Sequence, residues 1–249
     1  MASDEVLPAA GAGRGAGLVV DLAHKARSLF LAGGVEATLR ALVQLSVETV
    51  DGCGSASVVL LQNGRLTTRA GTGSGAVTLD EIQVAQEEGP CLDAVATSGI
   101  SCAEDLAADP RWPRYGPEAA ACGARSQLAM RLWAGGSIGC LNLYGAHPGA
   151  FGYVQRAQGL VLADLGGTAV TLAQLRDEQI LLAENLHQAL VTRELVGQAQ
   201  GILMERERIG AAEAFGVLKR ASQHLNVKLR EVAEELVATG EMPGTGRGR

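Results

Sequence analysis

The chain is poor in aromatic residues and proline, and it has no long apolar run. Aromatic side chains make up 3% of its 249 residues, and proline occurs seven times. No segment approaches the ~18 consecutive apolar residues of a membrane-spanning helix. The first eighteen residues, 1–18, carry acidic residues before their first arginine and lack an apolar core, unlike a signal peptide. We therefore expect a disordered leader over residues 1–18 and a cytoplasmic protein that does not enter a membrane.

Signatures of covalent frameworks, metal sites and enzymes are also missing. The five cysteines are odd in number and show no CxxC spacing, and the four histidines are scattered. There is no GxSxG or Walker loop, and we expect the glycine runs Gly11–Gly15 and Gly71–Gly75 to be loops. The sequence thus predicts no metal, no cofactor and no enzymatic activity. Cys91 follows Gly89-Pro90 at an expected helix start, where the backbone dipole can lower a thiol pKa, so it is a redox candidate.

Composition indicates a folded protein of one large domain or two small ones, because 47% of the residues are apolar. The net charge of -6 counts against binding to nucleic acid. The charge is uneven along the chain, however. Between Leu186 and Gly240, seven basic residues balance seven acidic ones. The C-terminal part is therefore locally neutral.

The first half of the chain alternates helical and strand patterns. Val19–Val50 has apolar residues at helical spacing and is broken by Gly33-Gly34, which predicts two helices. Val58–Leu61 and Leu66–Ala70 flank Asn63-Gly64, the strongest two-residue hairpin signal. Further along, we expect helices over Thr78–Glu87, from Pro90 and over Glu118–Cys122, and strands over Ile100–Cys102, Ser126–Trp133 and Ser137–Tyr144. This order predicts an α+β fold with helices on an antiparallel sheet.

Several motifs in this region resemble the GAF family of small-molecule sensor domains. They are EGPCLDA from Glu88, DPRWPRY from Asp109, GARSQLAM from Gly123 and GCLNLYG from Gly139. The family usually has a proline where this chain has Met130-Arg131-Leu132. The resemblance implies a sensor domain, which we place at 19–154, and a small-molecule ligand that the motifs do not identify. Candidate pocket residues are Arg111, Trp112, Tyr115, Arg125 and Trp133, which in Pro-rich loops can equally be structural clasps.

From Gln155 onward the chain becomes rich in Ala, Leu and Gln, and apolar residues recur with a 3.5-residue period. The repeating positions are Leu165, Thr168, Leu172, Leu175, Gln179, Leu182, Leu186, Ala189, Arg193 and Val196. This period is typical of a coiled coil, so we expect a linker helix over 155–186 that pairs with a second copy, with Gln179 fixing the register. The alternative is that the helix packs back on its own sheet.

The remaining residues predict a three-helix module over 187–240, followed by a disordered tail over 241–249. One helix ends near Arg208, a second covers Ala211–Gln223, and a third covers Val227–Ala238. The expected centre of the module consists of Ile202, Leu203, Phe215, Leu218, Leu229 and Ala233.

This module resembles the ANTAR family of RNA-binding antitermination domains. The matching residues are Ala199, Gly201 to Met204, Ala214, Phe215, Ser222, Asn226, Lys228 and Leu229. The resemblance implies binding of paired hairpins in nascent transcripts, which prevents termination. It assigns candidate RNA contacts to Arg193, Gln200, Lys219, Arg220, Ser222, Asn226, Lys228 and Arg230. The family commonly has lysine at the position of Gln200, so phosphate binding there would be weaker.

Two other interpretations of the C-terminal part are open from the residues alone. Its polar side chains can form an ordinary solvated face with caps at a helix junction. The chain can also be a small-molecule or thiol-redox sensor whose helical tail docks a protein partner.

Overall fold

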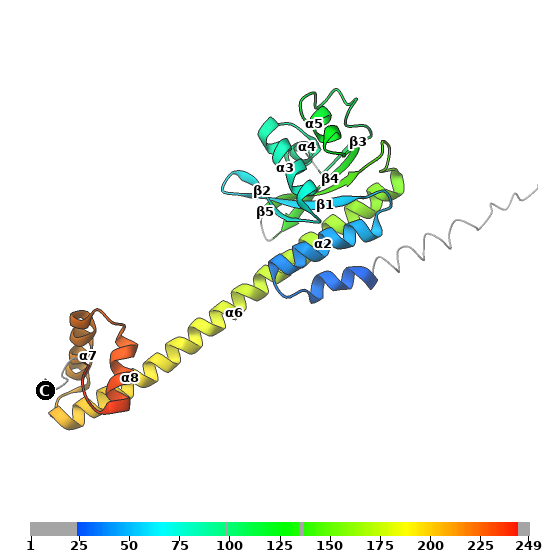
Figure 1. Cartoon of the computed structure of the whole chain (residues 1–249). Coiled ribbons are helices and arrows are strands. Elements are labelled where there is room, and N and C mark those ends of the chain that lie inside the picture. Colours follow the sequence, from blue (N-terminus) through cyan, green and yellow to red (C-terminus); the bar gives the residue numbers. More distant parts are fainter. Residues whose placement is uncertain (1–23, 98, 135–136, 244–249) are drawn as a thin grey trace, which may run out of the picture. The chain divides into compact units, whose positions relative to one another are not determined.

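The computed structural model describes residues 24–97, 99–134 and 137–243, which fold as two compact units (Figure 1). The N-terminal unit extends to Asp177 and the C-terminal unit begins at Glu178. The predicted leader 1–18, the run Gly11–Gly15 and most of the predicted tail lie outside the described residues. None of the described helices is both long and apolar enough to cross a membrane.

A five-stranded antiparallel sheet in the order β2-β1-β5-β4-β3 forms the centre of the N-terminal unit. The predicted hairpin is confirmed: β1 (Ser55–Gln62) and β2 (Arg65–Gly71) flank Asn63 and Gly64, whose φ angles of 51° and 77° are the left-handed pair of a tight turn. The other strands are β3 (Ile100–Ala103), β4 (Ser126–Ala134) and β5 (Ser137–Gly145). The α+β prediction is therefore correct.

The two faces of the sheet differ in chemistry because side chains alternate along each strand. One face is apolar and belongs to the main core, with Val58, Leu60, Leu128, Met130, Leu141 and Leu143. The opposite face carries buried polar side chains, namely Ser57, Gln127, Asn142 and Tyr144. The two faces consequently need different covers.

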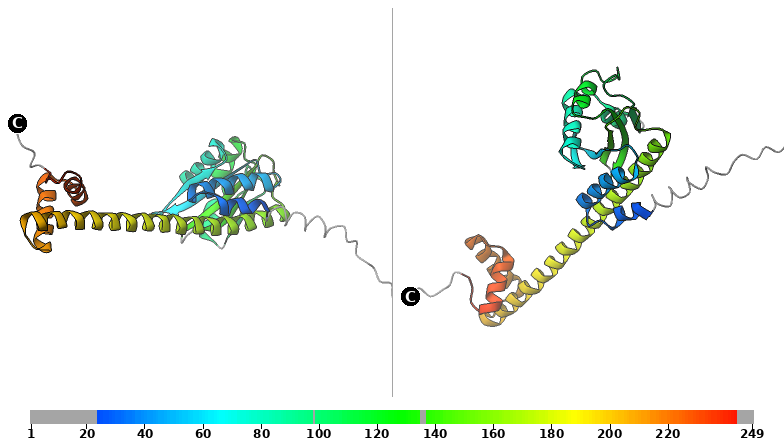
Figure 2. Two further views of the ribbon diagram at one scale, coloured as in Figure 1. Left: turned by 90° about the horizontal axis from the view of Figure 1, so that it is seen from below. Right: turned by 45° about the vertical axis from the view of Figure 1, so that its right-hand side comes forward.

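Helices cover the apolar face closely (Figure 2). They are the helical residues 24–31, α2 (Val35–Thr49) and the first turns of α6 (Tyr153–Glu207). Glycines in α6 permit the contact: a Cβ at Gly166 would lie 2.4 Å from a methyl of Leu42, and one at Gly167 would lie 2.1 Å from the carbonyl oxygen of Trp133. The start of α6 thus lies almost directly on its neighbours.

Three shorter helices cover the polar face: α3 (Ser74–Gln86), α4 (Pro90–Ala96) and α5 (Tyr115–Ala121). The predicted starts of α3 and α5 were wrong. Gly71 ends β2 and α3 starts at Ser74, so of the expected loop Gly71–Gly75 only Thr72 and Gly73 lie outside a strand or helix. α5 starts at Tyr115 because Pro117 falls in the first turn, where a backbone N–H has no partner inside the helix anyway.

α6 is one continuous helix of 55 residues, and the environment of its side chains changes along its length. Leu162 and Val170 are buried in the core of the N-terminal unit, whereas every residue from 175 to 190 is exposed. Farther on, Val196 and Leu203 are buried in the C-terminal unit. Val196, predicted to face a partner helix, therefore packs within its own chain.

The C-terminal unit is the predicted three-helix module. The end of α6, α7 (Ala211–Leu225) and α8 (Leu229–Thr239) enclose a small core that includes Leu218 and Leu236. Phe215 is a correction to the expected centre, because it is 40% exposed. Met242 packs against the same core, so the packed chain extends past the predicted end of the module at residue 240.

We predict that Gly167→Ala lowers the free energy of unfolding of the N-terminal unit by about 1–3 kcal/mol, because the methyl group meets a backbone oxygen that cannot rotate away. Both tryptophans of the chain lie in this unit, so tryptophan fluorescence during urea unfolding measures the effect. Gly75→Ala is the matched control, since that helical glycine has open space around it and should gain up to about 1 kcal/mol. Equal stability of the two variants would contradict the close packing of α6.

Candidate functional site

A buried carboxylate, Asp80 of α3, lies over the polar face of the sheet. Its side chain is 2% exposed. Its oxygens accept hydrogen bonds from Ser57 Oγ at 2.8 Å, Thr68 Oγ1 at 2.9 Å, Asn142 Nδ2 at 2.9 Å and Tyr144 Oη at 2.6 Å. Donors from three strands therefore converge on one acidic group.

Burial raises the pKa of Asp80 to about 6, and the hydrogen bonds from Tyr144, Ser57, Thr68 and Asn142 oppose that rise. Burial, with the charge of Asp80 adding to it, also raises the pKa of Tyr144 well above its ordinary value. Asp80 is thus the group in this layer that changes charge close to neutral pH.

The hydrogen-bonded layer continues from Asp80 toward α5. Gln83 Nε2 donates to Tyr144 Oη at 3.3 Å, Gln127 Nε2 donates to Gln83 Oε1 at 3.3 Å, and Tyr115 Oη donates to Gln127 Oε1 at 2.7 Å. Among the described residues, the buried side-chain polar atoms without a partner are Thr49 Oγ1 and Arg131 Nε, both outside this layer. The polar side chains of the layer therefore have hydrogen-bond partners within it, and their hydrogen bonds tie α3 and α5 to the sheet.

The redox candidate Cys91 lies beside this layer and is 3% exposed. Its backbone N–H donates to Gln83 Oε1 at 2.9 Å. Its side chain is hydrogen-bonded to that of Cys140, whose thiol pKa is raised well above its ordinary value, first of all by burial. Sequence reasoning had not paired these two cysteines, which are 49 positions apart, and a redox role for Cys91 stays a prediction.

The structure does not gather the five candidate pocket residues into one pocket. Trp112 and Tyr115 are buried in the core beneath α3 and α5, and Trp112 Nε1 donates to Asp93 Oδ2 at 3.1 Å. Trp133 is 58% exposed, and it lines a surface depression together with Asp164 and other residues of α6.

The two arginines of that set are held by neighbouring carboxylates. Arg111 pairs with Asp109 at 2.6 Å and stacks on Trp112, 4.1 Å from the ring centroid. Arg125 pairs with Asp105 at 2.9 Å. Arg111 Nη2 also donates to the carbonyl of Cys102 in β3 at 2.7 Å, so it ties its loop to the sheet, which is the structural role that the Pro-rich sequence had left open.

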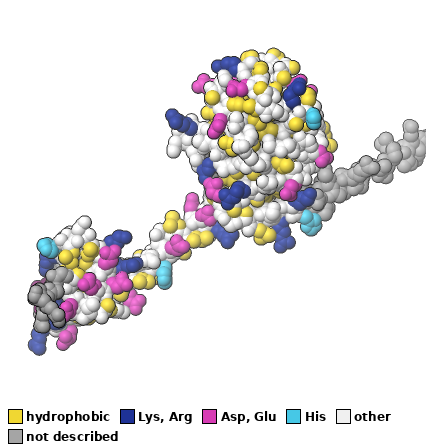
Figure 3. All heavy atoms as spheres, in the orientation of Figure 1, with side chains coloured by type: hydrophobic (Ala, Val, Ile, Leu, Met, Phe, Trp, Pro, Cys, Tyr) yellow, Lys and Arg dark blue, Asp and Glu magenta, His cyan; other side chains and the backbone are white. Residues whose placement is uncertain are grey.

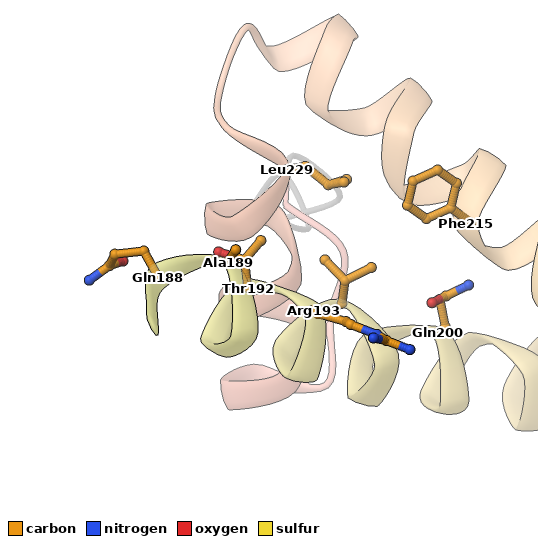
Figure 4. A pocket seen from close by; sticks show the side chains of 8 residues that line it. Gln188, Ala189, Thr192, Arg193, Gln200, Phe215 and Leu229 are labelled. Carbon is orange, nitrogen blue, oxygen red and sulfur yellow. The ribbon is translucent and has the colours of Figure 1, made fainter. Parts of the chain in front are cut away.

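In the C-terminal unit, a groove of about 530 Å³ runs between α6 and the helices α7 and α8 (Figure 4). Phe215 and Leu229 lie on one side of it, across from α6. The α6 residues that line it are Gln188, Ala189, Thr192, Arg193, Val196 and Gln200. Two candidate RNA contacts, Arg193 and Gln200, therefore share one concave surface.

The other candidate RNA contacts divide into turn residues and free cations. Ser222 Oγ donates to the carbonyl of Val227 at 2.7 Å, and Asn226 ends α7 with a left-handed φ of 53°. The Ser222 side chain and the Asn226 backbone thus form the turn between α7 and α8, and the Asn226 side chain is exposed. Lys219, Arg220 and Lys228 are exposed.

Two polar contacts organise the groove. Arg230 Nη1 donates to Gln188 Oε1 at 2.8 Å, and Gln200 Nε2 donates to the carbonyl of Ala211 at 2.9 Å.

Acidic and basic side chains are interspersed on the visible face of the module in Figure 3, in agreement with its equal numbers of acidic and basic residues.

Comparison with protein families decides the assignment of the N-terminal unit. The model of the GAF domain matches residues 32–171, more than half of the chain. The chain belongs to the GAF family. The model of the ANTAR domain matches residues 184–237, directly after it. Both resemblances noted in the sequence are therefore confirmed.

Solved structures with the same fold are distant in sequence. A free methionine-R-sulfoxide reductase from Neisseria meningitidis is 17% identical, with a TM-score of 0.51 over 71% of this chain and 96% of that one. The GAF domain of a phosphoenolpyruvate-protein phosphotransferase from Coxiella burnetii is also 17% identical, with a TM-score of 0.51 over 65% and 96%. A bacteriophytochrome from R. palustris is 12% identical, with a TM-score of 0.56 over 82% and 46%.

At these identities the likeness shows the fold alone. No curated protein matches the chain significantly.

Within the GAF domain, sequence reasoning missed the layer around Asp80. The alternation in GCLNLYG was a usable signal, because it places Asn142 and Tyr144 on one face of β5 and Leu141 and Leu143 on the other. Asp80 itself gave no signal, since an aspartate in a short helix is usually a surface residue.

We predict that the GAF domain loses stability as the pH rises from about 4 to about 7. The raised pKa of Asp80 means that the folded state favours the protonated form, so this stabilisation is present below the unfolded pKa and is lost as the pH rises through about 6. The loss is on the order of 2–3 kcal/mol. Asp80→Asn should remove this part of the pH dependence, measured by urea unfolding across the pH range, while Asp164→Asn at an exposed site should behave as wild type. Parallel profiles for wild type and Asp80→Asn would refute the assignment.

Proposed function

We propose that this protein is a signal-responsive, RNA-binding regulator that binds hairpins in nascent transcripts and prevents transcription termination. The main support is the match to the ANTAR domain over residues 184–237, together with the exposure of Lys219, Arg220 and Lys228 in that module. A GAF domain on the same chain supports control of this activity by a signal. The protein would act in the cytoplasm, where transcripts are made, and would have no catalytic step of its own.

The exposed face of α7 is the proposed RNA-binding surface. Phe215, Lys219 and Gln223 follow one another at four-residue spacing, so they lie on one side of the helix. Asn226 and Lys228 continue from it across the turn to α8. Cations of this kind hold phosphates, and amides hydrogen-bond to the base edges of unpaired loops.

One module by itself should bind RNA weakly, because its charges balance. The middle of α6 provides a surface through which two chains, and so two modules, can associate. Its exposed stripe at 3.5-residue spacing contains Leu172 (52% exposed), Leu175 (51%), Leu182 (68%) and Leu186 (61%). A second copy of the chain covers such a stripe in a coiled coil, with Gln179 as the polar position that sets the register.

A dimer carries two modules and can bind two neighbouring hairpins of one transcript. The second binding event is then intramolecular and gains from a high effective concentration. The signal received by the GAF domain would act on the pairing of α6 and so on the bivalent binding. Dimerisation is therefore part of the proposed mechanism and not only a property of the protein.

We predict that replacing Lys219, Arg220 and Lys228 by alanine weakens binding to a tandem-hairpin RNA and flattens its salt dependence. Each lost phosphate contact should reduce the slope of log K against log salt by about 0.7–0.9. RNA that crosslinks to the protein in cells is first identified by sequencing. The same RNA sequences are then synthesised, and their binding is measured by fluorescence anisotropy at several salt concentrations. Replacing Arg27, Arg40 and Arg65 removes three exposed cations outside the module and outside α6, and should leave the slope unchanged.

If the crosslinking recovers no RNA, the C-terminal module does not act on transcripts. A tail that docks a protein partner would then be favoured.

We predict that Leu182→Glu dissociates the dimer, because it places a charge in the paired stripe. Sedimentation equilibrium should show a monomer at micromolar concentration, and affinity for a two-hairpin RNA should fall to that for a single hairpin. Leu181→Glu is the matched control: its leucine is similarly exposed, at 59%, but lies off the stripe. A wild-type protein that stays monomeric with and without RNA would contradict the mechanism.

A further inference from the structure

We infer that the groove between α6 and the helices α7 and α8 is a binding site for one unpaired nucleobase, which stacks on Phe215. This inference rests on the proposed RNA-binding function and names how the module would recognise an RNA loop. It assigns a role to the concave surface of the module, beyond the phosphate contacts of its exposed cations.

The shape and lining of the groove fit a flat aromatic ligand. Its volume of about 530 Å³ lies within the usual range of small-molecule sites. Val196 and Leu229 provide apolar walls, and Phe215 beside them is 40% exposed. An aromatic ring left partly open at the rim of a groove is a stacking platform, and every base has a face to stack on it.

Cationic side chains lie beside the groove, where they can contact the phosphates of a bound nucleotide. Arg193 lines the groove, and the hydrogen bond to Gln188 holds the Arg230 guanidinium beside it. Both cations can neutralise the phosphates that flank the stacked base, and Arg230 also has Glu234 as an exposed neighbour at 3.9 Å. Lys219 lies one turn of α7 beyond Phe215 and extends this basic path.

Gln200 gives the site a hydrogen-bond acceptor for the edge of the base. Its amide nitrogen is engaged by the carbonyl of Ala211, at 2.9 Å. In Figure 4 the amide oxygen is on the side that faces the other lining residues. That oxygen can accept a hydrogen bond from the edge of a base, from an exocyclic amino group of adenine, cytosine or guanine or from the ring N3–H of uracil. The glutamine found where the related domains commonly have lysine thus becomes a base-reading residue.

A second copy of α6 is the competing occupant, since the stripe of paired positions leads into the groove. Arg193 argues against it. In a parallel coiled coil the two Arg193 side chains would face each other across the interface, and their like charges would repel. Among the described residues, no carboxylate contacts Arg193 to offset that repulsion. The intramolecular burial of Val196 one turn later also removes the next position from pairing.

The test uses the full-length protein and a library of tandem RNA hairpins with randomised eight-nucleotide loops. RNAs enriched by the wild-type protein are measured against Phe215→Leu and Phe215→Tyr. Phe215→Leu should weaken binding about 5- to 100-fold with an unchanged salt slope, because a stacking contact and no charge is lost. Phe215→Tyr keeps the ring and should bind as wild type. A 2-aminopurine at the enriched unpaired position should be quenched by wild type and not by Phe215→Leu.

The outcomes separate this inference from the function on which it rests. If no RNA is enriched, the proposed function fails. If enriched RNAs bind Phe215→Leu as tightly as wild type, RNA binding stands and the base site is overturned. If Phe215→Leu instead shifts the dimer dissociation constant, the groove belongs to a second copy. Far-ultraviolet circular dichroism shows whether each variant is folded.

Discussion

The structure depends on one constraint: the apolar stripe of a single 55-residue helix must be covered along its whole length. At its start the stripe is covered by the GAF sheet and α2, where Gly166 and Gly167 allow almost direct contact. At its end, α7 and α8 cover Val196 and Leu203. Only the stretch between them has no partner within the described chain, and an isolated helix of that length is marginal in water. In the proposed dimer a second copy would cover this stretch, because its stripe has the same periodicity.

The GAF sheet places its polar chemistry and its contact with α6 on opposite sides of the same strands. On β5, Asn142 donates to Asp80 while Leu141 and Leu143 face the core beneath α6. A change in charge or hydrogen bonding at Asp80 therefore has a contiguous path through one strand to the helix. The polar side chains of this layer are hydrogen-bonded to one another, so a signal acting there would have to rearrange existing hydrogen bonds.

Local and periodic signals predicted most of the fold. Asn63-Gly64 predicted a hairpin, alternation predicted β4 and β5, and the 3.5-residue period predicted a long helix, although its end positions Leu165 and Val196 pack within the chain. The features that were missed depend on contacts between distant residues. Asp80 meets donors from three strands, Cys91 meets Cys140, and Phe215 lies at the edge of a groove that forms only when three helices meet. No pattern within a short window encodes such contacts.

Hydrogen exchange along α6 tests the central claim most directly. At concentrations where the protein is dimeric, amides over the whole helix should exchange slowly. On dilution to monomer, amides of residues 176–190 should exchange fast while those of residues 159–173 and 196–206 stay protected by packing within the chain. Slow exchange of the middle segment in the monomer, or fast exchange of it in the dimer, would contradict the account.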